Sequence, residues 1–144
     1  MPRIAVVRKK ALAQGLSSPG ILREKAFEGD GVLVSRSTVG GGVVSAWHHH
    51  GERHLYGLLI SGHMRLEFGP KGKEAVDLNP GDYFSIPAGL VHRDVNLSRT
   101  GKVLITNILV GGGQVVVDVK GRRGRDAPFT RPPRRPCGPP IHND

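Results

Sequence analysis

The sequence contains a single cysteine, Cys137, which cannot close a disulfide bond within the chain. It lies in a proline-rich segment far from the histidine clusters, so we assign it no chemical role. Long apolar runs are also missing, because the longest, such as VLITNILV at 103–110, fall far short of the roughly 20 residues that span a bilayer. The N-terminus has neither a secretory apolar core nor a cleavage site. We therefore expect a soluble cytoplasmic protein with no membrane association.

Acidic residues are scarce: 12 Asp and Glu stand against 21 Lys and Arg, which gives a net charge of +9. Much of this excess lies in residues 121–144, a segment rich in arginine and proline and nearly without aliphatic side chains. Phe129 is the only aromatic residue there, so the interleaved aromatics of a nucleic-acid stacking platform are absent and nucleic-acid binding is not expected. We divide the chain into an N-terminal arm (1–30), a barrel (31–120) and a basic tail (121–144).

Helical periodicity is scarce as well. Short runs rich in Val, Ile and Leu are separated by glycine or proline turns at a spacing of roughly 8 to 12 residues, which is typical of sandwiches and barrels. Residues 11–30 are ambiguous between a short helical turn after Pro19 and an edge strand. The pattern predicts an all-β fold with one barrel per chain and strands at 31–38, 43–50, 54–61, 63–69, 74–78, 83–86, 91–96, 102–110 and 114–119.

The stretch WHHHGERHLYG, at 47–57, holds four of the seven histidines. On a strand, His48 and His50 share one face and His49 takes the other. After a turn or bulge, His54 begins a new strand and can point back toward the first two. The alternative is a solvated polar turn, or histidines that are hydrogen-bonded in a core. The window alone leaves both interpretations open.

A second stretch, GDYFSIPAGLVHRDVN at 81–96, favours the metal-site interpretation. It places glycine, proline, glycine, histidine and asparagine at spacings that resemble the second conserved motif of the cupin superfamily. The first cupin motif is resembled by Gly42, His48, His50 and His54, with His54 where the family usually has glutamate. A shift of one residue would put Leu55, which cannot bind a metal, at that position. We favour His54, with a bulge beyond it that absorbs the late arrival of Gly62.

The resemblance covers residues 31–119 and implies a small single-domain cupin with a double-stranded β-helix, or jelly-roll, barrel. It further implies one divalent transition metal ion, Fe, Mn, Ni, Cu or Zn, held by a four-histidine site. Imidazole suits these ions, whereas Ca and Mg prefer oxygen. Four neutral ligands leave the charge of the ion unneutralised, which favours an anionic substrate. The implied ligands are His48, His50, His54 and His92.

Other side chains have weaker assignments. Glu52 and Tyr56 are candidates for hydrogen bonds to the ligands or for a place in the pocket. Tyr83 is a candidate hydroxyl near the cavity, and three charged residues are candidates for its mouth, namely Arg53, Arg93 and Asp94. His49, His63 and His142 are not expected to bind the metal, and Trp47 is expected to pack between layers or at a subunit contact.

Three functions remain open at this point. The favoured one is a mononuclear non-haem dioxygenase acting on a small chelating anion. The others are a metal-dependent isomerase or lyase, and a non-catalytic cupin that binds a small molecule. The sequence singles out no catalytic residue, and its two terminal segments lead us to expect a homodimer.

Overall fold

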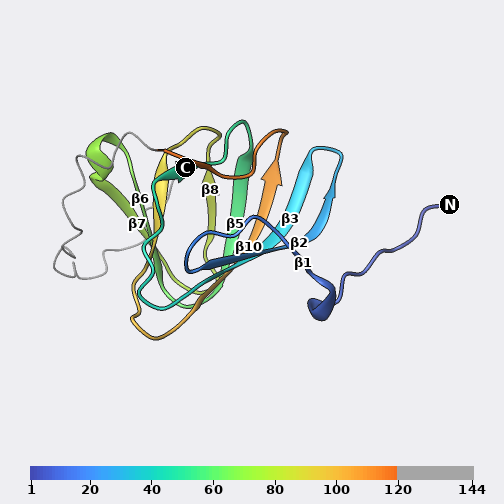
Figure 1. The fold of residues 1–144 in the computed structure, drawn as a ribbon, viewed down its shortest axis with the longest axis horizontal. Helices are drawn as coiled ribbons and strands as arrows, with labels where there is room; N and C mark the ends of the chain where they lie inside the picture. Colours follow the sequence, from blue (N-terminus) through green and yellow to red (C-terminus); the bar gives the residue numbers. More distant parts are fainter. Residues whose placement is uncertain (120–144) are drawn as a thin grey trace.

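A computed structural model describes residues 1–119 of the chain. The basic tail expected at 121–144, with Cys137 and His142, lies outside the described residues. Two antiparallel β-sheets pack face to face in the described part (Figure 1). Two short 3-10 turns, η1 (Lys9–Ala11) and η2 (Pro70–Gly72), are its only helical elements. Among residues 1–119 there is no helix long and apolar enough to cross a membrane.

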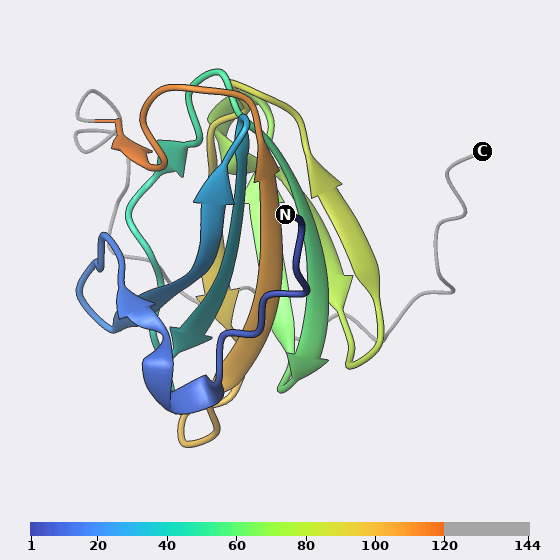
Figure 2. The same cartoon turned by 90° about the vertical axis from the view of Figure 1, so that its right-hand side faces the viewer.

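The larger sheet has six strands, whose long members run side by side in Figure 2. In spatial order they are β1 (Ala13–Gln14), β2 (Ile21–Gly29), β3 (Val32–Val39), β10 (Val103–Val110), β5 (His54–Ser61) and β8 (Tyr83–Ile86). The smaller sheet has five, in the order β11 (Val117–Asp118), β4 (His48–His49), β9 (His92–Asn96), β6 (Met64–Phe68) and β7 (Glu74–Leu78). The expected all-β architecture is confirmed.

The strand prediction differs from the structure at three places. Of the strand expected at 114–119, only Val117–Asp118 pair, as β11. Residues 43–50 do not form one continuous strand: only His48–His49 pair as β4, and Val44 makes an isolated bridge to Val95. The ambiguous segment before residue 31 contains β2, which is hydrogen-bonded between β1 and β3. Residues 21–29 therefore belong to the six-stranded sheet and not to an arm outside the barrel. The chain that precedes η1 extends away from the barrel (Figure 1).

The core lies between the two sheets and follows the alternation of side chains along each strand. In β10, Val103, Ile105, Asn107 and Leu109 are buried, while the residues between them are not. Leu59 and Val103 have no exposed surface at all. The same alternation decides which side chains of β5 and β9 can reach the interior.

Asn96, at the end of β9, connects several loops at one end of the barrel through hydrogen bonds of its side chain. Its buried side-chain amide donates to the backbone carbonyl oxygens of Val39, Gly40 and Gly101, at 3.2, 2.9 and 2.8 Å. Its carbonyl oxygen accepts a hydrogen bond of 2.9 Å from the N–H of Ser98. The asparagine of the second motif therefore stabilises the fold, because it provides hydrogen bonds to backbone groups that are buried or partly buried.

Candidate metal centre

His48 and His50 both point into the barrel and are buried. His49, between them, points the other way, and its Nδ1 accepts a hydrogen bond of 2.9 Å from the N–H of Gly51. Trp47 is also buried, with the guanidinium of Arg93 lying 4.6 Å from its ring centroid. It is a packing residue, and Arg93 lies against it rather than at the mouth of the cavity.

His92, on β9, faces His48 directly, because the two residues are partners in the β4–β9 pairing. The ring centroids of His48 and His92 are 4.4 Å apart, and that of His50 lies 5.4 Å from the first and 5.0 Å from the second. One nitrogen from each imidazole lies within 4.8 Å of the other two. We call His48, His50 and His92 the three-histidine cluster.

Backbone carbonyl groups orient all three rings. Nδ1 of His48, His50 and His92 lies 2.8, 2.8 and 2.9 Å from the carbonyl oxygens of Ala46, Val115 and Leu90. A carbonyl oxygen can only accept, so each Nδ1 carries the proton and each Nε2 presents a lone pair. Nε2 of His92 is buried and has no hydrogen-bond partner. This is the arrangement in which imidazole binds a metal.

Burial keeps two of these imidazoles neutral. It lowers the pKa of His50 from 6.5 to about 4, although the hydrogen bond to Val115 works in the opposite direction. Burial also lowers the pKa of His92. Both rings are therefore neutral at neutral pH, with a proton on Nδ1 only, which is the form that coordinates a cation. The donor set, the tautomers and the orphaned Nε2 all fit a divalent transition ion.

His54 does not join the cluster. Its ring lies 4.5 Å, centroid to centroid, from that of Tyr56, on the outer face of β5, while Leu55 lines the cavity. The structure thus brings together three of the four predicted ligands. Tyr56 is 51% exposed and Glu52 is also exposed, so neither lines the cavity.

The register of β5 explains the position of His54. The pairing with β10 is regular from His54, opposite Val110, to Leu59, opposite Ile105, and the irregularity comes only after Leu59. The bulge that absorbs the extra residue before Gly62 therefore lies at the far end of β5, too late to turn His54 inward. Leu55 consequently occupies the inward position that the fourth ligand would need.

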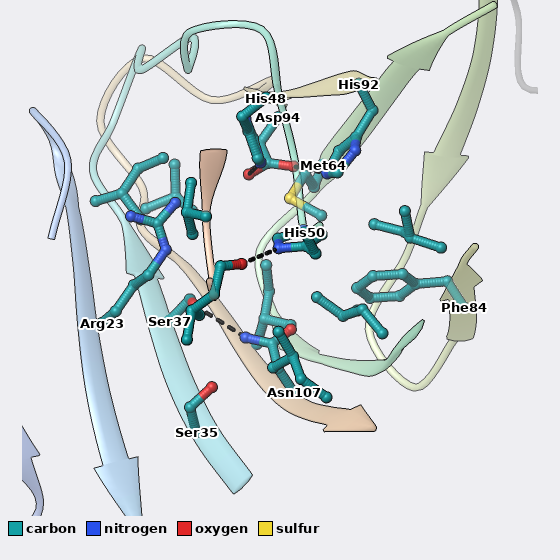
Figure 3. A pocket seen from close by; sticks show the side chains of 18 residues that line it. Arg23, Ser35, Ser37, His48, His50, Met64, Phe84, His92, Asp94 and Asn107 are labelled. Atoms are coloured by element: carbon teal, nitrogen blue, oxygen red, sulfur yellow. Dashed lines mark hydrogen bonds and ion pairs between the residues drawn. The ribbon is translucent and has the colours of Figure 1, made fainter. Parts of the chain in front are cut away.

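Asp94 lies beside the cluster (Figure 3). Its Oδ2 is 3.8 Å from Nε2 of His48, its Oδ1 is 4.0 Å from Nε2 of His92, and its side chain is 16% exposed. From the sequence, Asp94 is a candidate only for the cavity mouth. The available signal was its position two residues after His92, which on a strand means the same face.

The cluster opens onto a cavity of about 40 Å³. This is room for a few water molecules, since one needs roughly 10–15 Å³ on the same measure. Polar lining comes from Arg23, Ser35, Ser37 and Asn107, and the Asn107 amide donates to the Ser37 hydroxyl at 2.9 Å. A wider pocket of about 410 Å³ shares Arg23, Ser35, Val115 and Val116 with it, and Arg53 lines this outer space.

Arg23 stands where the two spaces meet. Its Nη1 donates to the Ser18 hydroxyl at 2.7 Å and to the Leu16 carbonyl oxygen at 3.3 Å. Burial lowers the pKa of Arg23, and the negative charges of Asp94 and Asp118 oppose this effect. The guanidinium stays charged at neutral pH and adds one fixed positive charge to the lining.

Comparison with known proteins identifies the family. The cupin domain model matches residues 35–109, which is half of the chain. The chain belongs to the cupin family. The cupin barrel accounts for the two antiparallel sheets and for the histidines gathered between them. No curated protein matches the chain in sequence.

Solved cupin structures are similar in fold. KdgF from Halomonas sp. superposes with a TM-score of 0.63 at 20% identity, covering 76% of this chain and 96% of that one. Oxalate decarboxylase OxdC of Bacillus subtilis, as its S161A mutant, gives 0.61 at 20% identity, covering 72% of this chain and 29% of the other. Oxalate oxidase in complex with the substrate analogue glycolate gives 0.53 at 22%, covering 62% and 46%. At these identities the likeness shows the fold alone.

Proposed function

We propose that this cupin is a mononuclear, non-haem metal-dependent dioxygenase that acts on a small chelating anion. The observation that carries the proposal is the three-histidine cluster, which opens onto a cavity that is also lined by the partly buried Arg23. Three imidazoles leave coordination positions free on an octahedral ion. A substrate that chelates, together with dioxygen, needs such free positions.

The charge of the cavity favours an anion. Neutral imidazoles do not offset the two positive charges of a divalent ion, and the charge of Arg23 adds to them. Arg23 would bind a carboxylate or enolate oxygen and orient the substrate toward the cluster. Asp94 is the only carboxylate that lines the cavity in the described part of the chain, and it offsets this positive charge only in part.

The size of the cavity limits the substrate. A space of about 40 Å³ beside the cluster admits a group of a few heavy atoms, while any longer portion would lie in the outer pocket of about 410 Å³. We therefore favour small dicarboxylates, α-hydroxy acids and β-diketones over flavonols. A bound Fe, Mn, Ni or Cu ion would supply Lewis acidity and the redox chemistry that dioxygen requires. Dioxygen would be the oxidant in each case. Cleavage of a β-diketone would place both of its atoms in the products, whereas a dicarboxylate or α-hydroxy acid would give up two electrons and two protons and reduce dioxygen to hydrogen peroxide.

The test is oxygen consumption by the protein loaded in turn with Fe, Mn, Ni and Cu. Oxalate, glycolate, acetylacetone, catechol and a flavonol would be offered as substrates, with the His50→Ala variant as the control. We expect uptake with at least one small chelating anion and none with the control. No uptake with any metal would contradict the proposal.

A second candidate is a metal-dependent isomerase or lyase. Asp94 favours it, because this carboxylate reaches the cluster and is placed to take a proton from a bound substrate. The dependence of turnover on oxygen distinguishes the two candidate functions. Turnover that continues at the same rate under anaerobic conditions would support the isomerase or lyase and contradict the dioxygenase. A ligand that raises the melting temperature without turnover would instead support the non-catalytic cupin considered from the sequence.

We also propose that the protein is a homodimer. The segment before η1 extends from the barrel, and its apolar side chains Ile4 and Val6 are 96% and 60% exposed. Packing of this segment on a second copy would bury them. Light scattering should give twice the mass of the chain for the full protein. A monomer at all concentrations would contradict this proposal.

A further inference from the structure

We infer that the Asp94 carboxylate is the fourth protein ligand of the metal, in the place of the glutamate that the first cupin motif usually supplies. The inference rests on the proposed function only in requiring that the three-histidine cluster binds an ion. It assigns to β9 a ligand that comes from β5 in the usual arrangement.

The usual position of the carboxylate is occupied by an apolar side chain. Leu55 is the residue of β5 that faces the cavity, and it is 5% exposed. His54, next to it, lies on the opposite face against Tyr56. The strand that usually completes the site therefore offers no donor atom, and a fourth ligand has to come from elsewhere.

Asp94 has the required placement. It lies on the same face of β9 as His92, because the two residues are two positions apart on a strand. Its two oxygens each approach a different Nε2, that of His48 at 3.8 Å and that of His92 at 4.0 Å. Ligand atoms that each lie about 2.1 Å from one ion are separated by at most about 4.2 Å. Both separations fit within that limit. The ligand atoms that already lie within 4.8 Å of one another are those of the three histidines, so binding to the same ion requires the Asp94 side chain to turn toward His50.

These separations are also too long for hydrogen bonds. A nitrogen and an oxygen that share a proton lie about 2.7–3.2 Å apart. In their neutral form His48 and His92 carry the proton on Nδ1, where backbone carbonyls accept it, so the Nε2 lone pairs and the Asp94 oxygens are then all acceptors facing a common space. Facing acceptors repel each other unless a cation lies between them. A divalent ion satisfies the carboxylate and both imidazoles at once.

Substitution separates the ligand role from a supporting one. Asp94→Asn keeps the shape of the side chain and removes its charge. The dissociation constants of this variant for Zn²⁺ and for Co²⁺ would be measured by competition with a chromophoric chelator. The visible spectrum of its Co²⁺ form would be recorded as well. We expect affinity to fall at least tenfold and the cobalt bands to change in position and intensity. Asp77→Asn, at an exposed carboxylate paired with Arg65, is the matched control and should change neither.

A rescue variant tests the position of the ligand. Leu55→Glu, added to Asp94→Asn, returns a carboxylate to the usual strand and should restore most of the affinity. In the unmodified protein labelled with ¹³C-aspartate, one equivalent of Zn²⁺ should shift a carboxylate stretching band in the infrared. This measurement keeps the inference testable if the variants fail to fold.

The outcomes are distinct. Unchanged affinity and cobalt spectrum in Asp94→Asn would overturn the ligand assignment and leave the three-histidine metal site standing. A loss of affinity with an unchanged spectrum would also overturn it, because Asp94 would then only support the ligands. If the unmodified protein binds neither ion, both the assignment and the proposed function are wrong.

Discussion

Nδ1 of His50 lies 2.8 Å from the carbonyl oxygen of Val115, a residue 65 positions later in the chain. This hydrogen bond joins the histidine-rich segment to the loop between β10 and β11. It fixes the ring so that Nε2 faces His48 and His92. The metal site therefore depends on a contact between two distant parts of the sequence.

His50→Ala should abolish tight metal binding, since it removes one of three converging imidazoles. His49→Ala is the adjacent control, because its ring points away and accepts only a backbone hydrogen bond from Gly51. Calorimetric titration with Zn²⁺ of both variants would measure the difference, which we expect to exceed a hundredfold in affinity, or about 2.7 kcal/mol. Equal binding by the two variants would show that the assignment of faces is wrong.

His54→Ala should leave the affinity for Zn²⁺ unchanged within about twofold. The His54 ring packs on Tyr56, outside the cavity, so its loss removes no donor atom. The same titration checks the expectation. A large loss of affinity would instead support the four-histidine site that the sequence predicts, with β5 shifted by one residue.

Acid should destabilise the metal-free protein. The pKa of His50 falls from 6.5 to about 4 on folding, so between these values the unfolded chain binds more protons than the folded one. The free energy of unfolding therefore rises with pH in this window, and it falls by up to roughly 3 kcal/mol as pH drops from 6.5 to 4. His92 acts in the same direction. Urea unfolding with a chelator present would measure it, and His50→Gln should show a shallower slope.

Asn96→Ala should destabilise the fold, although Asn96 does not line the cavity. It leaves the buried carbonyl group of Val39 and the partly buried ones of Gly40 and Gly101 without this donor. We expect a loss of about 2–4 kcal/mol and a melting temperature lower by roughly 10 °C. Asn79→Ala is the control, because that asparagine is exposed. A variant as stable as the unmodified protein would contradict the structural role of Asn96.

Arg23→Gln should weaken the binding of oxalate to the Zn²⁺-loaded protein by about tenfold or more, because a charge-assisted hydrogen bond contributes about 1.5–3 kcal/mol. Calorimetry with oxalate would measure the change. Arg65→Gln, which breaks a surface pair with Asp77, is the control and should bind as the unmodified protein does. If Arg23→Gln binds oxalate equally well, the positive charge of Arg23 has no part in recognition.

The fold was largely predictable because alternation and turns are local signals. The bounds of β5, β7 and β8 match the expected strands, and the spacing of both motifs indicated the cupin barrel. The segment that became β2 was ambiguous, because its charged residues leave no clear alternation and its place is set by pairing with β3. Such pairing is a tertiary effect that propensity does not contain.

The site was predictable in part for a similar reason. His48, His50 and His92 follow from alternation and spacing, whereas the choice between His54 and Leu55 depends on a register of one residue. That register is decided where the β5–β10 pairing shifts, which the sequence does not mark. Asp94 was visible only as a neighbour of His92 on one strand face, and its distance from His48 depends on the pairing of β4 with β9.

The carbonyl groups that hold the three rings belong to Ala46, Leu90 and Val115, and all three are main-chain atoms. Every residue type carries such an oxygen, so mutation at these positions need not loosen the imidazoles, and at Val115 it can change the wall of the binding space. A lineage built on this scaffold is free to exchange one substrate for another while its inorganic centre stays the same.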